Sequence, residues 1–309
     1  MIQGRRPSSL RLYSGYINQW QTFCVKLGID YIHASVASGL TFLQTLFSKG
    51  LGYSALNTAR SALSSILILP NAQLFGGHPD VKLFMKGIFN SNPPKVRYVS
   101  TWDPAQVLLF LQSWYPADNI TIDKLVMKVT MLIMLVTGQR PQILSNLSLT
   151  HMQIKENVIE FHLGPLDLKQ GRPGYRPQII TLQRYPSNPK ICVHRYLSTY
   201  LQRTALLRKD IKAVFITNTK PYRVASSNTI SRWLKCTLKA AGIDVTQFSA
   251  GSSRAASTSA AKQSGLPIDQ ILKTGGWSRE DTFTKFYDKK ILPCSFGEAV
   301  LSRVMQNTD

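Results

Sequence analysis

Length, composition and charge set the first limits on what this chain of 309 residues can be. A hydrophobic content of 44% is enough to fill a folded core and excludes a disordered tail, and the length favours two domains. The chain has 37 Lys and Arg residues but only 16 Asp and Glu residues, so its net charge is +21. A partner with many negative charges is therefore expected, with nucleic acid as the first candidate and an anionic membrane surface as the second.

The first part of the chain is predicted to be helical. Apolar residues recur at steps of three and four over 10–27, 40–47 and 54–66, and a shorter helix is expected at about 81–88. Each stripe gives one apolar face, as expected for helices that pack on a common core. The pattern therefore predicts a small helical bundle.

The third of these helices has a polar face built from Asn57, Arg60, Ser61 and Ser64. Such a face is suited to a DNA groove, where Arg and Asn contact base edges and Ser contacts phosphate. A solvated helix face has the same composition, so the pattern leaves both interpretations open.

A polar, Pro-rich and basic stretch follows, with few options for regular structure. We interpret it as a linker, at about 90–98, between a first domain, 1–92, and a second, 98–309. Its two cations, Lys95 and Arg97, are further candidate DNA contacts.

The second part of the chain mixes helices and strands. Two short strands, 158–163 and 178–182, flank a loop rich in Gly, Pro and cations, and another is expected at 213–216. Helices are expected at about 103–115, 121–136, 192–206, 228–241, 252–264, 267–273, 279–287 and 296–305. The predicted fold class is mainly α with a small β-sheet.

Other sequence-wide features favour a soluble protein. The longest apolar run, Met131 to Val136, is about a third of the ~20 residues that a membrane-spanning helix needs. The first residues do not resemble a secretory signal. The four cysteines are far apart and form no CxxC pair, which argues against a zinc ribbon or a disulfide framework. We expect an intracellular protein without a membrane partner.

Familiar catalytic motifs are missing from the sequence. It contains no phosphate-binding GxxxxGK[ST] motif, no GxGxxG after a strand and no HExxH. The histidines lack metal-ligand spacing, and no carboxylate cluster suited to two Mg²⁺ ions is visible. If the protein cuts DNA, we expect it to use a side-chain nucleophile and cations that stabilise the phosphate, without a metal.

Three segments contain such groups. In the first, an apolar helix ends at a glycine and a turn presents Arg140; in the second, Arg254 lies within a helix of small residues, where a large cation needs an anion. The third contains Trp277 and, ten residues later, Tyr287. Each has a plain structural interpretation when taken alone: a capping or ion-pair residue, a core aromatic, a packed tyrosine.

Taken together and in this order, the segments resemble the catalytic domain of tyrosine recombinases, the phage-integrase-like family. The resemblance covers about 98–290, and the helical first part resembles the family's core-binding domain, of the SAM-like kind. The residues around Arg140, at 168–174 and around Tyr287 are most similar to recombinases of eukaryotic mobile elements of the DIRS, Ngaro or Crypton kind.

The resemblance implies roles for the matched residues. Tyr287 would attack the scissile phosphate and form a 3′-phosphotyrosyl bond. Arg140 and Arg254 would hold the two non-bridging oxygens, on which charge grows in the transition state. A phenol with a pKa of about 10 needs activation by its surroundings to act at neutral pH.

The leaving group and the remaining positions are also assigned by resemblance. Lys169, between the two predicted strands, would protonate the 5′-oxygen, with Arg172 nearby as a competitor for that role and as a DNA contact. Trp277 would fill the position that holds His or Trp in the family, where an indole N–H can donate to the phosphate. The resemblance implies no metal and no cofactor.

Two positions depart from the family pattern. The box His-x-x-Arg has Gly251 at its first position, and glycine cannot donate a proton or orient the tyrosine. His162, on the strand that leads to Lys169, is the candidate substitute. Position 143, often acidic in the family, is Ile143. Loss of one general acid–base group costs about 10²–10⁴ in rate.

Three functions are therefore compared. The first is an active recombinase or integrase that exchanges strands of double-stranded DNA as a homotetramer and closes around it as a clamp. The second is a DNA-binding protein derived from such an enzyme, favoured by Gly251; the third is a type IB topoisomerase. The last helix, 296–305, would dock onto a neighbouring protomer or onto its own domain. The eukaryotic resemblance implies a nuclear protein, and the DNA target cannot be inferred.

Overall fold

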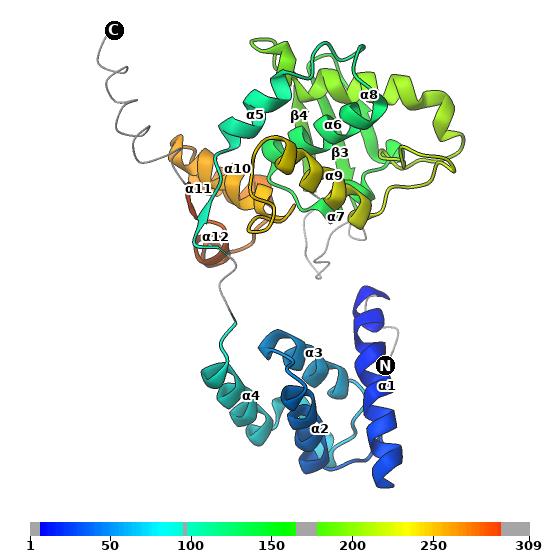
Figure 1. Ribbon diagram of the computed structural model, residues 1–309, viewed down its shortest axis with the longest axis vertical. Coiled ribbons are helices and arrows are strands. Elements are labelled where there is room, and N and C mark those ends of the chain that lie inside the picture. Colours follow the sequence, from blue (N-terminus) through cyan, green and yellow to red (C-terminus); the bar gives the residue numbers. More distant parts are fainter. Residues whose placement is uncertain (1–6, 95–97, 165–177, 292–309) are drawn as a thin grey trace. The chain divides into compact units, whose positions relative to one another are not determined.

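The computed structural model describes residues 7–94, 98–164 and 178–291 (Figure 1). By contacts, the chain divides into two compact units, residues 1–96 and 97–309. Twelve α-helices and two small sheets lie in the described residues, so the predicted class, mainly α with a small β-sheet, is confirmed. No described helix is long and apolar enough to cross a membrane.

The N-terminal unit is a helical bundle around one core. Its helices are α1 (Pro7–Leu27), α2 (Val36–Ser48), α3 (Tyr53–Leu63) and α4 (Pro79–Ser91), with the 3-10 turns η2 (Pro70–Ala72) and η3 (Phe75–Gly77). Trp20 lies in the centre, fully buried, and its indole N–H donates to the Tyr31 carbonyl at 2.8 Å. The predicted apolar residues of α2 and α3 line this core. Of the stripe predicted for α1 only Trp20 and Cys24 do so, joined by Tyr16 and Phe23, while Leu27 is exposed.

The third helix ends three residues earlier than predicted. After Leu63 the backbone N–H groups of Ser65 and Ile66 bond three residues back, to the carbonyls of Ala62 and Leu63, so the chain tightens into a turn. The Ser65 hydroxyl adds a bond to the Ala62 carbonyl at 2.5 Å. Serine side chains compete in this way with the helical pattern, which apolar periodicity alone does not register.

The C-terminal unit is built around α6, ten of whose residues are buried and which packs on α8, α9 and α10 (Figure 1). The helices of this unit are α5 (Pro104–Gln112), α6 (Ile122–Thr137), α7 (Pro141–Asn146), α8 (Val193–Arg208), α9 (Ser227–Ala240), α10 (Ser252–Gln263), α11 (Ile268–Gly275) and α12 (Glu280–Phe286), with the 3-10 turns η4 (Leu149–His151) and η5 (Pro189–Ile191). Because α6 is apolar on most sides, it can serve as the central helix of this unit.

An antiparallel sheet of three strands packs beside these helices. It runs β2 (Met152–Ile154), β3 (Val158–Leu163), β4 (Gln178–Gln183), and Leu163 pairs with Gln178 at the end that leads into the predicted Lys169 loop. A second, parallel pair joins β1 (Ser100–Thr101) to β5 (Lys290–Ile291). Neither β2 nor the second pair was predicted.

The prediction of a strand at 213–216 is wrong. The segment makes only isolated bridges, Ser148 with Ala213 and Ile216 with Val224. Two of its backbone oxygens bind a side chain: the guanidinium of Arg208 donates to the carbonyls of Ala213 and Val214, both at 2.7 Å. The apolar run is there because it fills the core, not because it pairs in a sheet.

A fully buried lysine, Lys128 on α6, fastens the end of α5. Its ammonium donates to the carbonyls of Leu111 and Trp114 at 2.6 and 2.7 Å and lies 3.8 Å from the centre of the Tyr196 ring. Burial lowers the pKa of Lys128 to about 7. Burial is the cause of the lowered pKa, and no carboxylate among the described residues counteracts it.

We expect Lys128 to make stability depend on pH. The unfolded chain keeps its lysine pKa near ~10.4, so between about pH 7 and that value it binds the proton more strongly than the folded chain, and stability rises with pH. Lys128→Met should lose this component, which is worth up to ~2–3 kcal/mol between about pH 7 and 9. Urea denaturation at both pH values measures it. Lys124→Met, exposed on the same helix, is the control; equal pH slopes in all three proteins contradict the prediction.

Candidate active site

The C-terminal unit contains an open hollow of about 860 Å³. Four cations line it, Arg140, Arg232, Lys235 and Arg254, together with Tyr287. No Asp or Glu is found among the described residues of its lining. A concave surface with several cations and no carboxylate is suited to an anionic ligand. We call this feature the hollow.

Arg140 reaches the hollow from a turn between α6 and α7. Helix α6 ends at Gly138, whose φ of +58° is left-handed and where a Cβ would lie 2.9 Å from Thr258 Cγ2. Gln139 turns inward, and its side-chain amide donates to the Thr274 carbonyl at 2.8 Å. Arg140 is then the residue that precedes α7, half-buried, with Pro141 at the first helical position. The glycine and the glutamine thus fix the direction of the arginine.

Arg254 lies in the first turn of α10 and is only 2% exposed. Its guanidinium donates to the carbonyls of Gly138 at 2.5 Å and Gly275 at 2.7 Å, and so joins the ends of α6 and α11. Its Nε is buried without a hydrogen-bond partner among the described residues. A buried guanidinium with a free N–H and no carboxylate bound to it has unused capacity to bind an anion.

The electrostatics of Arg254 support this interpretation. Burial, and next the charge of Arg140, lower the pKa of Arg254 to about 9, while Tyr287 acts in the opposite direction. Arginine keeps its proton in proteins, so the lowered pKa expresses the cost of holding a desolvated cation beside another cation. An anion placed between the two guanidinium groups would reduce that cost.

Trp277 supports Arg254 from behind. The centre of its ring lies 3.7 Å from the guanidinium carbon, and it is 9% exposed. At Gly275 a Cβ would lie 2.0 Å from Trp277 Cζ3, so this glycine makes room for the ring. Gly276, which has a left-handed φ of +68°, ends α11. The indole N–H is buried without a partner in the described chain, and Trp277 does not line the hollow.

Tyr287 closes the cluster at the end of α12. Its ring centre lies 4.8 Å from that of Trp277 and 5.0 Å from the guanidinium carbon of Arg254. The side chain is half-buried and lines the hollow with both arginines. The three predicted residues Arg140, Arg254 and Tyr287, which lie up to 147 positions apart in the sequence (287 − 140), therefore share one surface.

Solved structures of DNA recombinases and integrases share this arrangement of elements, although the sequence matches no protein-family model and no curated protein. A lambda integrase (75–356) dimer bound to a COC′ core site is 15% identical, with a TM-score of 0.56 over 94% of this chain and 92% of that chain. The XerH site-specific recombinase bound to palindromic difH substrate is 13% identical, with a TM-score of 0.56 over 89% and 72%. The Tn1549 transposon integrase (aa 82–397) with circular intermediate DNA is 14% identical, with a TM-score of 0.51 over 96% and 98%. The chain has the tyrosine recombinase fold.

Within the tyrosine recombinase fold of this chain, the position of the expected histidine is vacant. Gly251 precedes α10 and is exposed at the hollow, and a Cβ there would meet only Ser249 Oγ, at 3.7 Å. His162 does not fill the gap. It lies on β3 with its Nε2 3.7 Å from a Glu160 carboxylate oxygen, and it is not in the lining. None of the five histidines, all in the described part of the chain, lines the hollow.

Several predicted site residues lie outside the described residues. The hairpin of this recombinase fold is described up to its base, where Leu163 pairs with Gln178. The Gln178 amide donates to the Thr274 carbonyl at 3.1 Å, so the base of the hairpin contacts the residue next to Gly275, which binds Arg254. The predicted residues and segment outside the description are Lys95, Arg97, Lys169, Arg172 and the helix at 296–305.

The polar face of α3 belongs to the other unit, and its four residues are half-buried. The Ser61 hydroxyl donates to the Asn57 carbonyl at 2.9 Å. The Ser64 hydroxyl donates to the Arg60 carbonyl at 2.8 Å and accepts from the Gly76 N–H at 2.7 Å. Both hydroxyls therefore have partners within the unit, which leaves Asn57 and Arg60 as the side chains better suited to an external contact.

Sequence reasoning missed the contribution of α9 to the hollow. Ser227, Ser231 and Lys235 recur at four-residue steps on this helix, Arg232 follows Ser231, and all four line the hollow. The signal is present in the sequence, because α9 has the same combination of serines and a cation as the polar face of α3.

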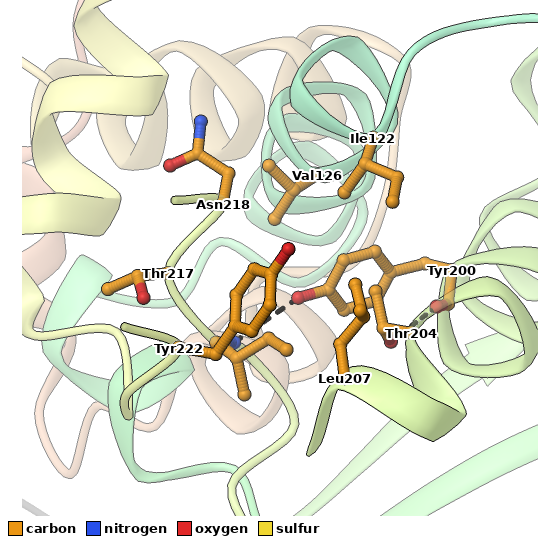
Figure 2. Close-up of a pocket in the computed structure, with 9 residues that line it drawn as sticks. Ile122, Val126, Tyr200, Thr204, Leu207, Thr217, Asn218 and Tyr222 are labelled. Carbon is orange, nitrogen blue, oxygen red and sulfur yellow. Dashed lines mark hydrogen bonds between the residues drawn. The ribbon is translucent and has the colours of Figure 1, made fainter. Parts of the chain in front are cut away.

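A second, smaller pocket has no comparable chemistry (Figure 2). It measures about 20 Å³, room for roughly one water molecule. Tyr200 and Thr204 of α8 lie at its wall, where the Tyr200 hydroxyl accepts from the Ile216 N–H at 3.2 Å. No charged side chain is found among the described residues that line it. No group of three His, Cys, Asp or Glu residues that could hold a metal ion occurs in the described ranges.

Proposed function

We propose that this protein is a site-specific DNA recombinase or integrase that cuts and rejoins DNA through a phosphotyrosyl intermediate on Tyr287. The observation that carries the proposal is the hollow, where Tyr287 shares a surface with Arg140 and the buried Arg254 and no Asp or Glu is among the described lining residues. The fold supports it, since the recombinase and integrases with that fold are described in complex with DNA.

The chemistry divides among the residues as follows. The hydroxyl oxygen of Tyr287 bonds to the scissile phosphorus, its proton passes to solvent or a neighbouring base, and the bond to the 5′-oxygen breaks. The guanidinium groups of Arg140 and Arg254 hold the non-bridging oxygens, on which negative charge increases in the transition state. The phosphodiester energy is kept in the new bond, so rejoining needs no cofactor.

Lys169 protonates the departing 5′-oxygen in this proposal, with Arg172 as the competing donor. Support comes from the base of the hairpin, because Gln178 binds the Thr274 carbonyl beside the Arg254 cluster. The positive charge of an ammonium or guanidinium group near the leaving oxygen also favours bond breaking. Trp277 contributes by holding the plane of Arg254, at 3.7 Å.

Double-stranded DNA is the proposed partner, held by cations over both units. On the C-terminal unit, Arg232 and Lys235 extend the hollow along α9, and Ser231 beside Arg232 offers a hydroxyl to a phosphate. On the N-terminal unit, the proposed contacts are Asn57, Arg60 and Ser61 of α3 and Ser64 directly after it, followed by Lys95 and Arg97. We assign 1–92 as the core-binding domain and 98–309 as the catalytic domain.

The proposal also includes a biological role and a location for the protein. Similarity of the motif segments to DIRS, Ngaro and Crypton recombinases favours integration of a eukaryotic mobile element, in the nucleus. Four copies on DNA would exchange two duplexes, and support for self-association comes from the lambda integrase dimer on its core site.

A second function is favoured by Gly251. Without a histidine in the lining of the hollow, the protein would keep its affinity for DNA and lose most of its cleavage rate. Such a protein would act as a DNA-binding factor. A type IB topoisomerase, which uses the same tyrosine chemistry without pairing two duplexes, is a weaker third candidate.

Covalent trapping tests the proposal. The protein is incubated with nicked DNA duplexes of randomised sequence, quenched in SDS and examined for a protease-sensitive shift of the labelled DNA. We expect an adduct with wild type and none with Tyr287→Phe, because the phenylalanine ring lacks the attacking oxygen. Tyr185→Phe, at an exposed tyrosine outside the hollow, is the control and should form the adduct normally. DNA binding without any adduct would favour the second function.

A further inference from the structure

Ser259 on α10 holds the backbone on both sides of Asp288, the residue after Tyr287. Its hydroxyl donates to the Tyr287 carbonyl at 2.9 Å and accepts from the Lys289 N–H at 3.0 Å. The side chain is 1% exposed. A serine hydroxyl has one hydrogen to donate, so its donor is committed to the segment that carries the tyrosine, and one of its two lone pairs is used there as well.

Two further contacts hold the same segment. The Lys262 ammonium, three residues after Ser259 on the helix, pairs with the Asp288 carboxylate at 2.5 Å. Beyond it, β5 (Lys290–Ile291) runs parallel to β1 (Ser100–Thr101). Both side chains of the ion pair are partly exposed, and surface ion pairs contribute little to stability. Ser259 is therefore the buried contact of this set.

Helix α10 therefore carries two kinds of group. Arg254, in its first turn, faces the hollow, and Ser259, five residues later, is bonded to the tyrosine segment. The two are fixed to each other by one stretch of helix, whose rise is about 1.5 Å per residue. Tyr287 itself lies just past α12, a helix of seven residues, with φ of −123° and ψ of −24°. The position of Tyr287 therefore depends on the contacts that hold the backbone from Tyr287 to Lys289.

We propose that Ser259 is a positioning residue, which sets the distance between the Tyr287 hydroxyl and a phosphate bound by Arg254. This inference rests on the proposed function. Attack on phosphorus requires the oxygen within about 3–3.5 Å and in line with the leaving group, and a misplacement of ~1 Å costs about 10² in rate. One buried hydroxyl that ties the nucleophile to the anion-binding helix limits such misplacement.

The test compares Ser259→Ala with Ser253→Ala in the adduct assay under single-turnover conditions. Ser259→Ala removes both hydrogen bonds with little change in volume, and we expect adduct formation to slow by about 10- to 100-fold. Ser253 is the matched control: it lies on the same helix, is fully buried, and its hydroxyl meets only the Met131 sulfur, at 4.0 Å. Ser253→Ala should react at the wild-type rate.

Two readouts separate positioning from a merely structural role. Affinity for the duplex pool should stay near wild type in Ser259→Ala, whereas the thermal midpoint should fall modestly because the Tyr287 carbonyl and the Lys289 N–H lose their partner. A duplex with sulfur in place of the bridging 5′-oxygen has a leaving group that needs no protonation, since thiols have a pKa of about 8.5. Because the inferred defect lies in the nucleophile, Ser259→Ala should stay slow on this substrate relative to wild type.

Each remaining outcome decides the matter. Wild-type rates in Ser259→Ala, recovery on the sulfur substrate, or equal slowing in Ser253→Ala overturns the inference and leaves the proposed function intact. Absence of an adduct in wild type itself overturns both. If Ser259→Ala does not fold, Ser259→Cys keeps a side chain of similar shape but has only a weak S–H donor. It should slow adduct formation several-fold at unchanged affinity, and a wild-type rate there counts against the inference.

Discussion

Replacing Gly251 with histidine is expected to speed covalent-adduct formation by about 10²–10⁴-fold, the contribution typical of one general acid–base group. The backbone at Gly251 has φ of −70° and ψ of −17°, which any residue can adopt, and a Cβ meets only Ser249 Oγ at 3.7 Å. The position lies on the hollow with Arg140, Arg254 and Tyr287. A Cβ there displaces no neighbour, so the change adds an imidazole at the hollow. Single-turnover trapping on the nicked duplex pool measures the gain.

Gly251→Ala controls for effects of the added Cβ on helix α10. Alanine supplies the same Cβ and similar backbone restriction without a titratable group, so its rate should equal that of wild type. The gain in rate of Gly251→His over wild type should also depend on pH. It should change over the range in which a histidine titrates, since the ordinary pKa of histidine is about 6.5. If alanine and histidine give the same rate, the position does not take part in the chemistry.

The larger elements of the fold follow from the sequence because their signals are local. The stripe at 10–27 and the β3 and β4 strands need only apolar periodicity, and the structure has them at nearly the predicted bounds. The β1 and β5 strands have two residues each, and their register pairs Ser100 with Lys290. No window of sequence reveals such a pairing, since it depends on how the chain closes. The same holds for 213–216, whose apolar run is bound by Arg208 instead of a strand.

The site was predictable to a similar extent. Order and spacing single out Arg140, Arg254 and Tyr287, and these lie on one hollow. The contacts that hold them do not follow from a motif: Trp277 lies against the face of the Arg254 guanidinium, and the hydroxyl of Ser259 reaches Tyr287 across 28 positions. Side-chain contacts between distant segments are fixed by packing, which a single sequence does not encode in any local pattern.

The second large effect is expected at Arg254, whose replacement should reduce activity much more than stability. Arg254→Met keeps an unbranched stem against Trp277 and removes the guanidinium. Adduct formation should fall by about 10²–10³-fold, as when one group that stabilises transition-state charge is lost. Stability should change far less than that loss of activity suggests, within about 2 kcal/mol, because two opposing effects of similar size are removed together.

Those effects can be named. The variant leaves the carbonyls of Gly138 and Gly275 without the guanidinium, at a cost of roughly 1–3 kcal/mol each. It also removes a cation whose pKa is lowered to about 9 by burial and by Arg140, which relieves a penalty of roughly the same order. A residue kept only for structure would show the opposite pattern, a large loss of stability and a proportionate loss of activity.

Anion binding distinguishes the two patterns directly. If Arg254 and Arg140 hold a phosphate, sulfate should raise the thermal midpoint of wild type more than chloride at equal ionic strength. Sulfate also stabilises proteins generally by exclusion from their surface, and Arg254→Met reports that general part alone. Arg140→Met, at a half-buried side chain, should lose the specific part of the shift as well. Equal sulfate shifts in all three proteins would mean that the two arginines do not form an anion site, and the catalytic role assigned to them would fail with it.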